Sequence, residues 1–115
     1  MKNFYYLESC STCKRIMKEL DLPASTNLRE IKSSPLTAEE ADRLAAKVGS
    51  YEAIFSKRAV KYRSMGLNKQ ELSEKDYRRF LLEDYTFLKR PVAETDSAAV
   101  AGNSKKAVAE MKDLI

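Results

Sequence analysis

The only two cysteines in this sequence, Cys10 and Cys13, form a C-x-x-C motif. A close thiol pair can cycle between dithiol and disulfide, so the spacing is typical of redox proteins. A structural zinc site normally takes four cysteine or histidine ligands, and the chain has no histidine. A secreted scaffold held by disulfides would also need more cysteines than these. The motif therefore predicts thiol redox chemistry without a metal.

The composition excludes several other classes of site. Without histidine the chain cannot build a Cys-His pair, a Ser-His-Asp triad or an imidazole metal site. Its net charge is +4, with acidic residues interspersed among the basic ones, which permits an anionic ligand without requiring nucleic acid. No run of about 18 apolar residues and no signal-peptide pattern occurs. We expect a cytoplasmic protein that binds neither membrane nor nucleic acid directly.

Two elements should position the thiols. The apolar and aromatic run Phe4–Leu7 predicts a strand that leads into the motif. A helix should follow and end before Pro23. Its apolar stripe, at helical spacing, consists of Cys13, Ile16, Met17 and Leu20. The first strand-to-helix junction is also where thioredoxin-like proteins carry C-x-x-C.

The junction predicts different roles for the two thiols. Cys13 belongs to the apolar stripe and should be buried, whereas Cys10 precedes the first helical turn and should be exposed. Unpaired N–H groups and the positive end of the helix dipole lower the pKa of a thiol at that place. We expect Cys10 to be the nucleophile and Cys13 the resolving thiol. Two buried, inert cysteines are the alternative, but that alternative does not explain their spacing at this junction.

The rest of the chain predicts an α/β domain. The further predicted elements are a weak strand at Thr26–Ile31, helices from a capping box at Thr37–Glu40 to Asp84, strands at Thr86–Lys89 and Ala98–Ala101 around a turn at Glu94–Ser97, and a helix after Gly102. This order predicts a mixed sheet flanked by helices. We expect one thioredoxin-like domain over residues 1–115, with an all-helical insertion at about 37–85.

Three motifs in order give a family resemblance. They are Cys10-Ser-Thr-Cys13-Lys-Arg15, Ile54-Phe-Ser-Lys-Arg58 and Phe87-Leu-Lys-Arg-Pro-Val92. Together they resemble the glutaredoxin-coupled arsenate reductases and the Spx regulators, and the resemblance runs over nearly the whole chain. It implies a thioredoxin-like fold with a helical insertion and a nucleophilic cysteine at Cys10.

The resemblance also assigns expected binding residues. By motif, Arg58 and Arg90 match the arginines that bind an oxyanion beside the thiol, and planar guanidinium groups suit that task. Pro91 matches a cis-proline next to the site. Lys14 stands where the reductases carry an arginine, and Arg15 follows one position late; both would add positive charge near the thiol. Cys13 departs from the reductases and matches the Spx proteins, which carry C-x-x-C.

Three functions remain open at this stage. The first is a thiol-dependent reductase with no bound cofactor, using glutathione or another thiol as co-substrate and glutaredoxin or a thioredoxin-type protein as donor. The second is an Spx-like regulator in which the cysteine pair is a redox switch and the RNA polymerase α subunit is the partner. The third is a thioredoxin-like domain that binds glutathione without catalysis. We expect a monomer in each case.

Overall fold

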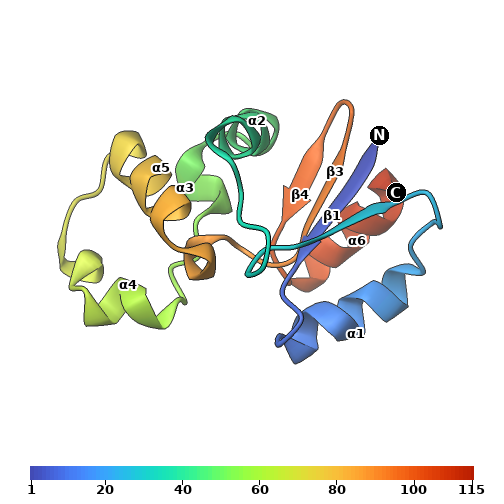
Figure 1. Cartoon of the computed structure of the whole chain (residues 1–115), viewed down its shortest axis with the longest axis horizontal. Helices are drawn as coiled ribbons and strands as arrows, with labels where there is room; N and C mark the ends of the chain where they lie inside the picture. Colours follow the sequence, from blue (N-terminus) through green and yellow to red (C-terminus); the bar gives the residue numbers. More distant parts are fainter. The chain divides into compact units, whose positions relative to one another are not determined.

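The computed structural model describes residues 1–115 and divides into two units (Figure 1). The first comprises residues 1–35 and 90–115, and the second comprises residues 36–89. The first unit holds the whole sheet, and the second is built of helices inserted in the chain between the second and third strands. The predicted α/β class with a helical insertion is therefore confirmed.

A four-stranded mixed sheet forms the first unit. Its strands are β1 (Lys2–Tyr6), β2 (Asn27–Glu30), β3 (Val92–Thr95) and β4 (Ala99–Ala101). Their order across the sheet is β2-β1-β3-β4. The β1 and β2 strands run parallel, whereas β3 is antiparallel to both of its neighbours. The mixed sheet expected from the order of elements is thus present, with β1 in an interior position.

Two helices cover one face of this sheet, α1 (Ser11–Leu20) and α6 (Lys105–Leu114) (Figure 1). The core between them and the sheet consists of Phe4, Ile16, Ala93 and Met111, all fully buried. Successive side chains of a strand point to opposite faces, so Phe4 meets these helices and Tyr5 points to the other face. Both side chains are buried, which explains why the first strand is a continuous apolar run.

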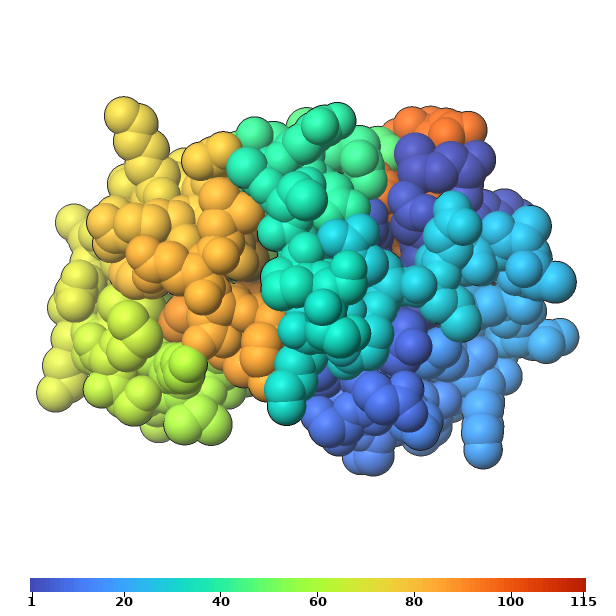
Figure 2. Space-filling model, viewed as in Figure 1, coloured from blue at the N-terminus to red at the C-terminus, as the bar shows by residue number.

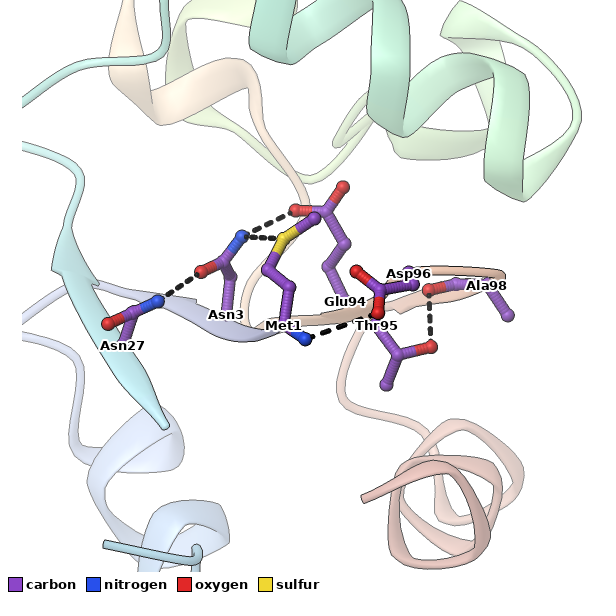
Figure 3. Close-up of polar contacts among 7 residues, drawn as sticks. All are labelled: Met1, Asn3, Asn27, Glu94, Thr95, Asp96 and Ala98. Atoms are coloured by element: carbon purple, nitrogen blue, oxygen red, sulfur yellow. Dashed lines mark hydrogen bonds and ion pairs between the residues drawn. The ribbon is translucent and has the colours of Figure 1, made fainter. Parts of the chain in front are cut away.

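The other face carries a polar cluster across three strands (Figure 3). The Asn27 amide donates to the Asn3 Oδ1 at 3.1 Å, and the Asn3 amide donates to the Glu94 carboxylate at 3.0 Å. The Tyr5 hydroxyl donates to the same Glu94 oxygen at 2.7 Å. Glu94 is fully buried, and a buried carboxylate needs such donors to offset its lost hydration.

The second unit is helical. Its elements are α2 (Ala38–Val48), α3 (Tyr51–Ile54), α4 (Val60–Ser64), η1 (Leu67–Lys69), α5 (Glu74–Glu83) and η2 (Tyr85–Phe87). The predicted capping box at Thr37 and Glu40 is confirmed at the start of α2. The core includes stacked Phe55 and Phe87 rings, 5.0 Å apart, with Tyr77 edge-on against Phe55.

The strand predicted at Thr86–Lys89 is wrong. Asp84 accepts hydrogen bonds from both the N–H and the hydroxyl of Thr86, which closes the 3₁₀ turn η2 instead. The segment then pairs with the end of α3, through the Lys89 N–H and the Ile54 carbonyl at 2.8 Å. The hairpin partner of β4 is β3, so the predicted turn at Glu94–Ser97 began too early.

Candidate active site

The candidate site lies where β1 passes into α1. Cys10 is the N-cap residue of α1, with extended φ and ψ angles of −92° and 107°. Its N–H donates to the Leu7 carbonyl at 3.0 Å, and its carbonyl accepts from the Lys14 N–H at 3.2 Å. In the space-filling view this blue connection reaches the surface at the lower edge (Figure 2). The local fold therefore places Cys10 at the positive end of the helix.

The two thiols differ in burial. Cys13 is fully buried, as its position on the apolar stripe predicts. Cys10 is half-buried, so it is more accessible than its neighbour but less exposed than the sequence indicated. Both residues are free thiols. A reagent from solvent therefore meets Cys10 before Cys13.

The surroundings of Cys10 favour its thiolate. Burial has the largest single influence and acts to raise the pKa, but several other groups together outweigh it. These are the N–H and the thiol of Cys13, the positive charge of Arg90 and the N–H of Thr12. The backbone N–H groups act without forming a standard capping hydrogen bond to the sulfur. The net effect is a Cys10 pKa below its ordinary value.

Cys13 is shifted in the opposite direction. Burial is the main cause and raises the pKa of its thiol to about 11, against the lowering effect of the Leu7 N–H. The neighbouring Cys10 raises it further, both by hydrogen bonding and by charge. The two opposite shifts favour Cys13 as the proton donor and Cys10 as the acceptor in the hydrogen bond between them.

Arg90 supplies the positive charge that acts on both thiols. It lies two residues before the start of β3, and the peptide bond between Arg90 and Pro91 is cis, as the resemblance implied. One guanidinium nitrogen, Nη1, is buried and has no hydrogen-bond partner. Buried donors are nearly always satisfied, so this guanidinium has an N–H available for a further acceptor.

The other predicted binding residues are placed differently. Lys14 of α1 forms an exposed ion pair at 2.8 Å with Glu8 of the preceding loop, and Arg15 forms one at 3.5 Å with Glu19 within α1. Arg58 is exposed and belongs to the second unit, between α3 and α4. Ligand binding by these three residues stays a prediction.

One contact at this site could not be predicted from the sequence. The Glu8 N–H, in the loop before Cys10, donates to the Glu30 carboxylate at 2.9 Å. The two residues are 22 positions apart, and a single glutamate at a strand end carries no local pattern that identifies it. Only the parallel pairing of β1 with β2 brings them together.

Two further features bear on the type of protein. No group of three or more His, Cys, Asp or Glu side chains is arranged to hold a metal ion. None of the helices combines the length and the apolar character needed to cross a membrane.

Comparisons with known proteins agree with the fold. The profile of the ArsC family matches residues 5–111. An arsenate reductase from Vibrio cholerae has a similar structure, with a TM-score of 0.79, 18% identity and 96% of each chain covered. The protein SACOL0876 from Staphylococcus aureus COL has a TM-score of 0.77 and 28% identity, covering 96% of this chain and 97% of its own.

A third structure is an arsenate reductase (ArsC) related protein from Brucella melitensis. Its TM-score is 0.72 at 22% identity, covering 91% of this chain and 88% of its own. A search of curated protein sequences found no match. At these identities the structural similarities establish the fold.

Proposed function

We propose that this chain, which belongs to the ArsC family, is a thiol-dependent reductase in which Cys10 is the nucleophile and Cys13 the resolving thiol. The observation that carries the proposal is the opposite shift of the two pKa values beside a guanidinium with an unused N–H. The substrate class is an oxyanion such as arsenate, and the electrons come from glutathione through a glutaredoxin or thioredoxin-type donor.

The first step is attack by the Cys10 thiolate on the central atom of the oxyanion. One oxygen of the substrate takes up protons from solvent and leaves as water, while a covalent bond forms between the central atom and the Cys10 sulfur. The Arg90 guanidinium suits the negative oxygen atoms because it stays charged and donates hydrogen bonds in a fixed plane. Its buried, unpartnered Nη1 is the donor available for this contact.

The second step is attack by Cys13 on the Cys10 sulfur. The neighbouring Cys10 contributes to the raised pKa of Cys13 through its charge and hydrogen bond. Once the Cys10 sulfur is covalently bound it is no longer a thiolate, so that contribution disappears and Cys13 ionises more readily. A Cys10–Cys13 disulfide forms as the bond to the substrate breaks, and the substrate leaves with two more electrons. Two thiols of the donor then restore the dithiol.

A coupled assay tests the proposal. Arsenate should drive NADPH consumption in the presence of glutathione, glutaredoxin and glutathione reductase, and Cys10→Ser should abolish it.

Loss of a hydrogen bond to a charged group costs about 1.5 to 3 kcal/mol. Arg90→Gln should therefore lower kcat/KM about 10- to 100-fold. The control is Arg79→Gln, a surface arginine of α5, which should leave kcat/KM unchanged. No reduction of an oxyanion or disulfide with any thiol donor would refute the proposal.

The C-x-x-C motif itself favours a second candidate, an Spx-like regulator. In that case oxidation of Cys10 and Cys13 would change binding to the C-terminal domain of the RNA polymerase α subunit. Binding of the dithiol and disulfide forms to that purified domain can be compared directly. Redox-dependent binding without reductase turnover would favour this candidate, and no binding in either state would exclude it.

A further inference from the structure

One peptide group connects Glu30 to Cys10. The peptide between Leu7 and Glu8 donates its N–H to the Glu30 Oε2 at 2.9 Å. The carbonyl of the same peptide accepts the Cys10 N–H at 3.0 Å. A peptide group is planar, so a carboxylate that fixes its N–H also fixes the direction of its carbonyl. The rigid Leu7–Glu8 peptide therefore links the Glu30 carboxylate to the backbone N–H of Cys10.

Glu30 is itself held firmly. It is the last residue of β2 and pairs in register with Tyr6, the last residue of β1. Its Oε1 accepts hydrogen bonds from the Lys32 N–H at 3.1 Å, the Ser33 N–H at 2.8 Å and the Ser33 hydroxyl at 2.9 Å. One carboxylate oxygen thus closes the turn after β2, and the other holds the loop after β1.

The hydrogen bonds favour the ionised form of this carboxylate. The N–H of Glu8 is the largest influence, followed by the N–H of Ser33, and together they lower the pKa of Glu30. Hydrogen bonds to a charged acceptor are shorter and about twice as strong as neutral ones. A carboxylate at this place is therefore well suited to orient the loop.

We propose that Glu30 is a positioning residue for Cys10, which holds the Leu7–Glu8 peptide so that the Cys10 sulfur stays at the first turn of α1. The same loop contributes the Leu7 N–H that faces the Cys13 sulfur, so both thiols depend on its placement. The inference rests on the proposed role of Cys10 as the nucleophile.

A positioning role and a purely electrostatic role predict opposite results. A negative charge near a thiol raises the pKa of that thiol, so its removal should lower the Cys10 pKa. If Glu30 acts by placing the loop, its removal lets the sulfur drift from the helix N–H groups and from Arg90, and the Cys10 pKa should rise. The direction of the shift therefore distinguishes the two roles.

Three variants separate the possible effects. Glu30→Gln removes the charge and leaves one acceptor oxygen where the carboxylate has two, so either the loop or the turn loses its partner. Glu30→Asp keeps the charge and the nearby turn but is one methylene too short to reach the Glu8 N–H. Glu8→Gln is the matched control, because it removes a charge from the same loop without touching the Glu30 contacts.

The measurement is the pH dependence of alkylation of the full chain by iodoacetamide, with mass spectrometry to follow Cys10 separately from Cys13. We expect Glu30→Gln and Glu30→Asp to raise the Cys10 pKa by about half to one unit, which slows alkylation about 3- to 10-fold at pH values below that pKa. Glu8→Gln should leave the pKa unchanged or lower it. Urea unfolding of each variant checks that it is folded under the conditions of the alkylation experiment.

The proposal is overturned if Glu30→Asp leaves the Cys10 pKa unchanged, or if Glu30→Gln lowers it. If Glu30→Gln fails to fold, Glu30→Asp decides alone, since it retains the turn. Alkylation needs neither substrate nor donor. A failure of the coupled reductase assay therefore leaves this result intact, and the two proposals can fail separately.

Discussion

Cys10 and Cys13 are three residues apart, yet their surroundings move the pKa of each in opposite directions. Helical geometry is the cause. Cys13 lies on the face of α1 that packs into the core, whereas Cys10 precedes the first turn, where N–H groups are unpaired. This difference was predictable from the sequence, because it depends only on the apolar stripe and the junction.

The buried Cys13 should make stability depend on pH. Its thiol has a folded pKa of about 11, above the ordinary value of 9.0, so the folded chain binds a proton that the unfolded chain releases. This contribution to stability is complete below 9.0 and is lost as the pH rises to about 11. The unfolding free energy of wild type minus that of Cys13→Ala, from urea titrations, should fall over that range.

Cys10→Ser provides the control for this pH effect. Burial is the main cause of the raised Cys13 pKa, so the variant should keep most of the fall in stability. If the unfolding free energies of wild type and Cys13→Ala change in parallel as the pH rises from 9.0 to about 11, the burial of the Cys13 thiol is contradicted.

Other residues could not be recognised from the sequence. Glu94 looked like part of a turn because it is charged, but it is buried in β3 with donors from Asn3 and Tyr5. Glu30 contacts a loop from a separate part of the chain. Contacts of this kind depend on how the strands pair, and the propensity of a single residue for helix or strand carries no information about that pairing.

At the scale of elements, a helix start and the second strand of the hairpin were predictable, and the first strand of the hairpin was not. The capping box at Thr37 uses residues three apart, so its signal is local. The segment 85–89 has the apolar and aromatic residues of a strand, but the Asp84 side chain closes a turn there and Phe87 packs on Phe55. Tertiary packing overrode the propensity.

The cap of α2 gives a stability prediction. The Thr37 hydroxyl accepts the Glu40 N–H at 3.1 Å, and the Glu40 carboxylate accepts the Thr37 N–H at 2.9 Å. Thr37→Ala removes the first of these bonds and should lower the unfolding free energy by about 1 kcal/mol. Urea unfolding measures this, with Ser25→Ala, an exposed residue outside the helices, as the control. Equal effects of the two substitutions would count against the cap.

At the scale of the whole molecule, the ArsC family membership and the thioredoxin-like unit agree with the order of elements expected from the sequence. The sheet unit contains both thiols, Arg90 and Glu30, whereas Arg58 belongs to the helical unit. The chemistry proposed for the thiols therefore needs only residues of the first unit.

Whole-chain mass tests the proposed resolving step. After one turnover without a donor, wild type should lose the mass of two hydrogen atoms, because Cys10 and Cys13 close an intramolecular disulfide. Cys13→Ser has no resolving thiol, so with glutathione present it should instead gain one glutathione at Cys10. Formation of the same glutathione adduct by wild type, with no intramolecular disulfide, would contradict the role of Cys13.

The most direct test of the account is the ionisation of Cys10, followed by the ultraviolet absorbance of its thiolate as the pH is raised. Wild type should show one ionisation below the ordinary thiol value of 9.0, which Cys10→Ser removes and Arg90→Gln shifts upward. A Cys10 thiol that ionises at or above 9.0, or that is unaffected by the loss of Arg90, would contradict the central claim.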